Sequence, residues 1–170
     1  MTALIFSDSH GRRDNIMEAL GRQIKVPDAV IFLGDGLRDI EYAELDGISA
    51  YCVRGNCDST VFSTAFAPDE HIITLGSKKI FITHGHRYGV KGLLSPLINR
   101  ARELGADVAL FGHTHEPFEK HIGIENEYGI ALDKPLWLMN PGSIGSYPYC
   151  FGCMEINSRG EILLSHGTLL

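Results

Sequence analysis

The stretch "ADVALFGHTHEP", residues 106–117, combines two features that decide how the rest of the chain is interpreted. Its apolar run, residues 108–111, has the length and composition of a buried strand, and Gly112 ends the run. His113 and His115 follow directly. They are either polar residues of a turn or ligands of a metal ion, and similar patterns elsewhere in the chain bear on that choice.

Four further apolar runs also lead into polar side chains that can bind a metal. Residues 3–6 lead into Asp8 and His10, residues 29–33 into Asp35, residues 48–53 into the segment Arg54 to Asp58, and residues 79–83 into His84 and His86. In α/β sheets, ligands bind at the carboxyl ends of the strands, so we expect these side chains to meet at one edge. Together with the opening stretch, these segments contain five of the eight histidines, which favours a shared function.

The alternative is ordinary turn chemistry at each strand end. An Asp or Asn after a strand is commonly a turn residue or a helix N-cap, and a glycine beside it is typical of turns. This explanation has to hold for all five segments at once. We therefore favour a metal site.

The donor types indicate which metals and which chemistry such a site supports. The candidate ligands are Asp8, His10, Asp35, Asn56, His84, His113 and His115. Imidazole, carboxylate and amide oxygen together suit Mn, Fe, Zn, Co or Ni better than Ca or Mg alone. Seven ligands exceed the need of one ion, whereas two ions sharing a carboxylate keep positions open for water and substrate. Two ions about 3.5–4 Å apart activate a bridging hydroxide for in-line attack on a phosphate ester.

Other catalytic schemes fit the sequence less well. No G-x-x-x-x-G-K-[ST] loop is present, and the "NPGSIG" segment has Pro141 where a nucleophile elbow needs glycine, so Ser143 is interpreted as a turn residue. Cys57 could act as a nucleophile only with a paired base, and the residues near it are already candidate metal ligands. The pair Cys150 and Cys153 lacks the further ligands of a zinc site, so we expect reduced, packed thiols.

The order of elements predicts an α/β fold with an antiparallel closing section. Strands are expected at residues 3–6, 29–33, 48–53, 79–83, 107–111, 136–139, 149–156 and near 161–165. Helical spacing appears in residues 12–23, with Asp14 as N-cap, and in residues 90–105, with Pro96 in the first turn and Gly105 as the stop. Two packed sheets with helices outside accommodate this order.

Length and charge set wider bounds. No linker or repeat divides residues 1–170, so we expect a single domain. The net charge of −6 argues against capture of nucleic acid polymers. The apolar runs are too short to span a membrane, and no leader is recognisable, so the expected location is cytoplasmic.

Taken together, five segments resemble the motif set of the calcineurin-like metallophosphoesterases. They are D-x-H at Asp8 and His10, G-D at Gly34 and Asp35, G-N-C-D at Gly55 to Asp58, H-G-H at His84 to His86, and G-H-T-H at Gly112 to His115. The likeness is greatest to the small single-domain phosphodiesterases of bacteria and archaea. The "NPGS" segment at residues 140–143 resembles a loop of the same branch.

This resemblance implies a sandwich of two mixed sheets flanked by helices, with a dinuclear centre at the carboxyl edge of the strands. It implies that Asp8, His10 and His115 hold one ion. Asn56, His84 and His113 would hold the other, and Asp35 would bridge them. The two ions would be divalent transition metals, with manganese the first choice and Ni, Co, Zn or Fe as alternatives. Asn56 would also contact the substrate phosphate, with His86 and Arg54 nearby.

One position departs from the family pattern. Many members carry a histidine after the asparagine of the G-N motif, where it protonates the leaving group, and this chain has Cys57. A thiol is a poor substitute for a poised imidazole, although the small-phosphodiesterase branch shares the change. Our hypothesis is that His86, Asp58 or metal-bound water supplies the proton, which favours substrates with good leaving groups.

Three functions therefore compete. The first is a metal-dependent phosphodiesterase or phosphatase that hydrolyses a small phosphate ester. The second is a non-catalytic protein-binding scaffold, as in the retromer subunit of this fold, and the third is a nuclease. The full ligand set favours the first. Specificity is expected from residues 59–71 and 116–134, where Phe118 and Tyr128 would face substrate or another subunit, and the sequence leaves open a homo-oligomer.

Overall fold

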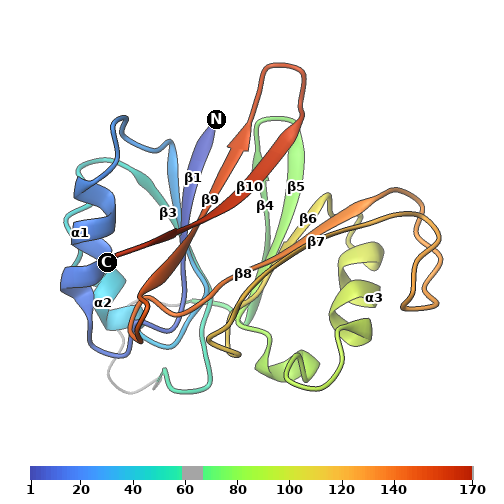
Figure 1. Ribbon diagram of the computed structural model, residues 1–170, viewed down its shortest axis with the longest axis horizontal. Helices are drawn as coiled ribbons and strands as arrows, with labels where there is room; N and C mark the ends of the chain where they lie inside the picture. Colours follow the sequence, from blue (N-terminus) through green and yellow to red (C-terminus); the bar gives the residue numbers. More distant parts are fainter. Residues whose placement is uncertain (59–66, 170) are drawn as a thin grey trace.

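The computed structural model describes residues 1–58 and 67–169, which form two five-stranded sheets packed face to face (Figure 1). The sheets have the orders β10-β9-β1-β2-β3 and β4-β5-β6-β8-β7. The strands are β1 (Thr2–Phe6), β2 (Ala29–Phe32), β3 (Ser49–Cys52), β4 (Glu70–Leu75), β5 (Lys78–Thr83), β6 (Val108–Leu110), β7 (Pro117–Ile122), β8 (Leu136–Pro141), β9 (Cys150–Ile156) and β10 (Ile162–Thr168). The helices are α1 (Arg13–Gly21), α2 (Leu37–Glu41) and α3 (Ser95–Glu103), with a 3-10 turn η1 (His86–Tyr88).

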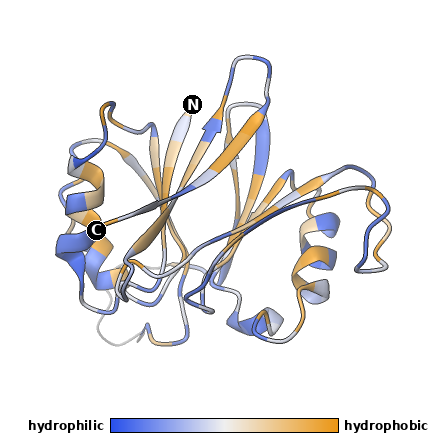
Figure 2. Cartoon of the chain, viewed as in Figure 1, coloured by the Kyte–Doolittle hydropathy of each residue, from blue (hydrophilic) through white to orange (hydrophobic). Residues whose placement is uncertain are grey.

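The predicted sandwich of mixed sheets flanked by helices is confirmed. Figure 1 shows α1 and α2 outside the first sheet and α3 outside the second. Alternation along β1 explains the layers: Ala3 and Ile5 belong to the core between the sheets, whereas Leu4 and Phe6 pack in the cluster that contains α1 and α2. Figure 2 shows hydrophobic residues concentrated on the strands and the hydrophilic ones toward the outer surface.

Each sheet contains three neighbouring parallel strands, and this arrangement positions the candidate site. Strand β1 pairs in parallel with β2, and β2 with β3. In the second sheet β5 pairs in parallel with β6, and β6 with β8. Because parallel strands end at the same edge, the segments after β1, β2, β3, β5 and β6 converge there.

All eight expected strands are present, and two more complete the second sheet. The additional strands, β4 and β7, lie at its edges and pair antiparallel with β5 and β8. Their sequences mix polar and apolar residues because an edge strand leaves many side chains exposed, and periodicity alone did not reveal them. Helix α2, with five residues, is too short for a periodic signal.

Three local predictions need correction. Helix α1 has Arg12 as N-cap, and Asp14 lies in its first turn instead. The helix expected from residue 90 begins only at Ser95, with the predicted Pro96 in its first turn. Phe118 and Tyr128 are partly buried against the hydrophobic cluster between α3 and the second sheet and do not line the cavity at the candidate site, so a substrate contact is not supported, whereas a contact with another subunit stays a prediction.

The four cysteines are all free thiols, as expected. Cys150 is buried on β9, and Cys153 is half-buried on the same strand, so packing explains both. Within residues 1–58 and 67–169, no helix is long and apolar enough to cross a membrane.

Candidate metal centre

Three overlapping groups of side chains bring potential metal ligands together at this sheet edge. The groups are Asp8 with His10 and His115, Asp8 with Asp35 and His84, and His10 with Asp35 and Cys57. Within each group, one ligand atom of every residue lies within 4.8 Å of those of the others. These residues come from segments after five different strands, so the fold assembles the cluster.

Asp8 is fully buried, and its two carboxylate oxygens have different surroundings. Its Oδ2 accepts hydrogen bonds from Ser7 Oγ at 2.5 Å and from the His113 N–H at 3.0 Å. Its Oδ1 lies 3.1 Å from His115 Nε2, 3.9 Å from His84 Nε2 and 4.0 Å from His10 Nε2. One oxygen therefore faces three imidazoles while the other holds the carboxylate in place.

His84 is oriented by the main chain of the opposite sheet. Its Nδ1 lies 2.7 Å from the carbonyl oxygen of Leu33, which accepts the ring N–H, so in the neutral ring Nε2 carries the lone pair. Nε2 lies 3.4 Å from Asp35 Oδ2. Burial alone would lower the pKa of His84, but the carboxylates of Asp35 and Asp8 outweigh it and raise that pKa.

Asp35 lies between the imidazoles and the Cys57 segment. Its Oδ1 accepts the Cys57 N–H at 2.7 Å. Burial alone would raise the pKa of Asp35, but the adjacent His84 imidazole and the Cys57 N–H outweigh it and lower that pKa far below its ordinary range. The carboxylate is therefore ionised at neutral pH.

The remaining imidazoles lie beside this cluster. The His113 ring is 5.1 Å from that of His84, and the His10 ring is 5.3 Å from that of His115, measured between centroids. Burial lowers the pKa of His113, helped by the charges of His84 and Lys91. Asn56 is exposed and belongs to none of the three ligand groups, and its amide donates to Cys57 Sγ at 3.2 Å.

A divalent ion fits this arrangement because it would bind two buried polar atoms that lack hydrogen bonds to the residues that the structure describes. Asp8 Oδ1 and His84 Nε2 are buried, and neither has a hydrogen-bond partner among the described residues. Buried polar atoms without partners are costly, and a cation between them would satisfy both. The oxygen and nitrogen donors suit first-row transition metals.

The other predicted functional residues occupy different positions. Asp58 Oδ1 accepts the N–H groups of Gly36 and Leu37, and its Oδ2 accepts those of Asp35 and Gly55, all at 2.8–2.9 Å. Both oxygens hold two loops together, and a role as proton donor does not fit these contacts.

Arg54 is also engaged elsewhere. Its Nε and Nη2 donate to Asp69 Oδ1 at 3.2 and 2.9 Å. Arg87 pairs with the other oxygen of that carboxylate. To contact a phosphate, the Arg54 guanidinium would therefore have to divide its N–H groups between the phosphate and Asp69.

His86 lies next to the cluster, with its ring centroid 5.4 Å from that of His84. Its Nδ1 is buried without a hydrogen-bond partner among the described residues. Burial lowers the pKa of His86, and the charges of His84 and Arg87 add to the effect, so the ring is neutral at pH 7. Asp35 and partial burial raise the pKa of the Cys57 thiol to about 11, so it stays protonated.

Two residues that support the site, Asn140 and Ser143, were not predicted to contact it, although Ser143 was interpreted as a turn residue. Asn140 donates from its amide to the Gly112 carbonyl at 2.9 Å and to Thr114 Oγ1 at 3.0 Å, which supports the G-H-T-H loop. Ser143 Oγ donates to the Asp8 carbonyl at 2.8 Å and accepts two N–H groups of its own turn. The sequence feature that could have revealed this support is the "NPGS" segment, because Asn140 and Ser143 both lie in it.

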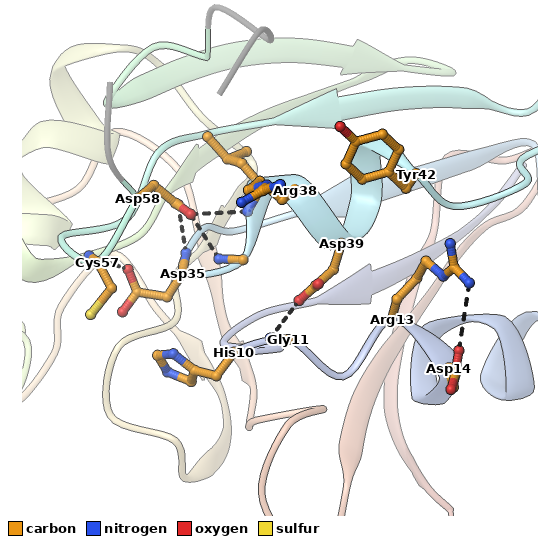
Figure 3. Close-up of a pocket in the computed structure, with 12 residues that line it drawn as sticks. His10, Gly11, Arg13, Asp14, Asp35, Arg38, Asp39, Tyr42, Cys57 and Asp58 are labelled. Carbon is orange, nitrogen blue, oxygen red and sulfur yellow. Dashed lines mark hydrogen bonds and ion pairs between the residues drawn. The ribbon is translucent and has the colours of Figure 1, made fainter. Parts of the chain in front are cut away.

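A cavity of about 630 Å³ opens beside the cluster. His10, Asp35 and Cys57 line one side, and residues of α1 and α2 line the other (Figure 3). The volume is in the range of small-molecule sites. The cluster therefore has room beside it for an organic group.

Comparisons with known proteins agree with this geometry. Residues 1–159 match the calcineurin-like phosphoesterase superfamily domain. The probable metallophosphoesterase YsnB of Bacillus subtilis is 41% identical over 144 residues, covering 85% of this chain and 75% of YsnB. The phosphodiesterase YfcE of Escherichia coli K12 is 29% identical over 127 residues, which cover 69% of this chain but only 59% of YfcE.

The fold is also shared with a solved structure. A protein of Streptococcus pneumoniae, described as a predicted phosphoesterase, superimposes with a TM-score of 0.68 at 25% identity. The alignment covers 99% of this chain and 97% of that one.

Proposed function

Because the chain belongs to the calcineurin-like phosphoesterase superfamily, we propose that it is a metal-dependent phosphodiesterase acting on a small phosphate ester. The observation that carries the proposal is a pair of buried atoms, Asp8 Oδ1 and His84 Nε2, that have no hydrogen-bond partner in the described part of the chain and lie inside a cluster of imidazoles and carboxylates. The name of YfcE, a phosphodiesterase, supports the diester as the substrate class.

The residues divide into two proposed ligand sets. Asp8, His10 and His115 would hold one ion, and Asn56, His84 and His113 the other, with Asp35 between them. Two bound divalent ions, manganese first among them, would neutralise the phosphoryl oxygens and activate water for in-line displacement. The closeness of Asp8 to His10 and His115 supports the first set.

The protein's own contribution is to bind and orient the ester. Asn56 is exposed and directly precedes Cys57 of the cluster, and its amide N–H would donate to a phosphoryl oxygen. A neutral His86 has one ring N–H to donate in the same way. Neither Cys57, whose pKa is about 11, nor Asp58, with both oxygens occupied, is suited to protonate a leaving group. We therefore expect esters with good leaving groups to react best.

Turnover tests this proposal. Metal-stripped protein is reloaded with Mn, Ni, Co or Mg and given bis(p-nitrophenyl) phosphate, p-nitrophenyl phosphate and cyclic nucleotides. Metal-dependent release of nitrophenol from the diester, abolished in Asp8→Asn, is the expected result. A protein that binds the ions stoichiometrically but hydrolyses none of these esters would support the scaffold alternative and refute the enzyme.

A further inference from the structure

The cavity beside the cluster has a wall that the proposed chemistry does not use. Figure 3 shows Arg13, from α1, and Arg38 and Tyr42, at α2, around the side away from Asp35 and Cys57. The ester phosphate would bind at the cluster, so the group attached to it can extend toward this wall. The residues of the wall then decide which organic group is preferred.

Three of the four carboxylates that line the cavity already have partners in the protein, and only Asp14 is exposed. Asp39 Oδ2 accepts Ser9 Oγ at 2.5 Å and the Gly11 N–H at 2.8 Å. Asp58 accepts four N–H groups, and Asp35 belongs to the cluster. The oxygens of these three carboxylates are therefore engaged by protein groups, which leaves Asp14 as the exposed carboxylate of the cavity.

The two arginines of the wall, Arg13 and Arg38, have few interactions with carboxylates of the protein. The Arg13 guanidinium lies 3.9 Å from Asp14, whose side chain is 96% exposed, and such an exposed pair contributes little. Arg38 has no carboxylate within ion-pair distance among residues 1–58 and 67–169. Both guanidinium groups are available to a ligand anion, which they can bind through paired N–H groups.

The third feature of this wall is aromatic. The Tyr42 side chain lines the cavity and is 58% exposed, so it offers a ring to a ligand. Flat rings stack on tyrosine faces and on guanidinium planes, whatever the exact ring system. A ring and an anion on the same ester arm would use all three residues.

We propose that this cavity selects phosphodiesters with one arm that carries a flat ring and a second negative charge, as in a nucleotide bearing an additional phosphate. Arg13 and Arg38 would bind the second anion and Tyr42 would stack on the ring. The inference rests on the proposed function for the reaction itself, in which water adds to phosphorus and one P–O bond breaks. It assigns specificity to residues outside the ligand set.

A pair of chromogenic diesters that differ by one phosphate tests the two arginines. The p-nitrophenyl ester of thymidine 5′-phosphate is compared with the same ester bearing a 3′-phosphate. Wild type should prefer the 3′-phosphorylated ester by about tenfold in kcat/KM, mostly through KM, as expected for 1.4 kcal/mol of added binding. Arg13→Gln and Arg38→Gln should each reduce the preference about threefold.

Matched variants separate charge from general disturbance. Arg38→Lys should retain part of the preference, because it keeps the charge but not the paired N–H groups. Arg159→Gln, in the turn between β9 and β10, should leave the preference unchanged. A wild type that does not discriminate between the two esters, or a preference that survives both glutamine variants, would overturn the proposal.

Tyr42→Leu isolates the ring contact. It should reduce kcat/KM for the thymidine ester about tenfold while leaving methyl p-nitrophenyl phosphate, which has no ring on its second arm, unaffected. An equal loss on both esters would refute the stacking role.

Binding distinguishes this inference from the proposed function. Metal-loaded protein is titrated with thymidine 3′,5′-bisphosphate and with thymidine 5′-phosphate. An arginine-dependent preference for the bisphosphate without turnover of any diester would refute the enzyme and support the cavity assignment. Turnover without that preference would support the enzyme and refute the cavity assignment.

Discussion

At the scale of single residues, the candidate ligands lie on backbone that most side chains avoid. Five of them have positive φ: Asp8 (55°), His10 (45°), Asp35 (58°), His113 (70°) and His115 (64°). Such conformations cost about 1 kcal/mol or more at a non-glycine residue. They arise because each chain segment turns sharply where its strand ends, and the sharp turn brings the side chain back over the sheet edge.

This strain predicts an unusual order of stability at position 10. With metal removed, His10→Gly should be more stable than His10→Ala by about 0.5–1 kcal/mol, because glycine adopts φ of 45° without steric cost. Chemical denaturation in chelator measures the difference. The same pair at Glu18, inside α1, is the control and should show the opposite order by about 1 kcal/mol. An alanine variant equal to the glycine variant at position 10 would show that the turn is not strained.

The two histidines of the G-H-T-H segment should serve different ions. His113 lies by His84, whereas His115 lies by Asp8 and His10. His113→Ala and His115→Ala should therefore each retain about one of two ions, and anomalous scattering from crystals of the two variants should locate different ones. Both imidazoles on a single ion would refute this assignment.

We expect Cys57 to limit which esters react. Placing a histidine at this position should raise kcat on alkyl esters, which are poor leaving groups, by about 10²-fold, since that is the contribution of a positioned general acid. On p-nitrophenyl esters the change should be small. Parallel rates for Cys57→His and Cys57→Ser on both ester classes measure the effect, and no gain on alkyl esters would contradict the account.

At the scale of elements, Asp107 ties three strands of the second sheet together. Its Oδ2 accepts the Lys79 N–H at 2.8 Å and its Oδ1 accepts Lys134 Nζ at 2.7 Å, while its carbonyl accepts the Trp137 N–H. Partial burial would raise the pKa of Asp107, but Lys134 and the Lys79 N–H outweigh it and lower that pKa. The ionised form is therefore favoured in the folded state.

The lowered pKa gives Asp107→Asn a defined pH dependence. A group with a depressed folded pKa adds stability above its unfolded pKa, about 3.9, and loses it as pH falls through the folded value. The variant should be less stable than wild type by about 1–2 kcal/mol at pH 7, and the gap should close below about pH 4. Urea unfolding across this range measures the gap. Asp133→Asn, at an exposed neighbouring carboxylate, should show no comparable change.

At the scale of the whole molecule, the cluster connects the two sheets. Asp8 and Asp35 follow strands of the first sheet, and His84, His113 and His115 follow strands of the second. The hydrogen bond between His84 and Leu33 already crosses between them. Bound ions would add further links across the same junction.

Metal removal should therefore destabilise the whole fold. An ion present at 100 times its dissociation constant stabilises the folded state by about 2.7 kcal/mol, which corresponds to roughly 5–10 °C in Tm for a chain of this size. Thermal unfolding with and without chelator measures the shift, and Asp8→Asn should lose it. A Tm that does not respond to ions known to be bound would contradict a junction between the sheets.

The sequence by itself determined the central strands, their order and the identity of the residues at their ends. Short apolar runs and the polar residues after them are local features, so they are readable from neighbours in the chain. The resemblance of five motifs in order then indicated the fold and the family, both of which are confirmed. The edge strands β4 and β7 and the helix α2 were missed because their patterns are short or mixed.

Only the tertiary structure decided what each polar atom does. Asp58 holds two loops, Arg54 pairs with Asp69, and the Leu33 carbonyl orients His84, and each contact joins atoms from separate segments. The wall formed by Arg13, Arg38 and Tyr42 likewise exists only because α1 and α2 pack side by side on one sheet. Residue type limits the chemistry of a side chain, but its partners depend on distances that the fold alone sets.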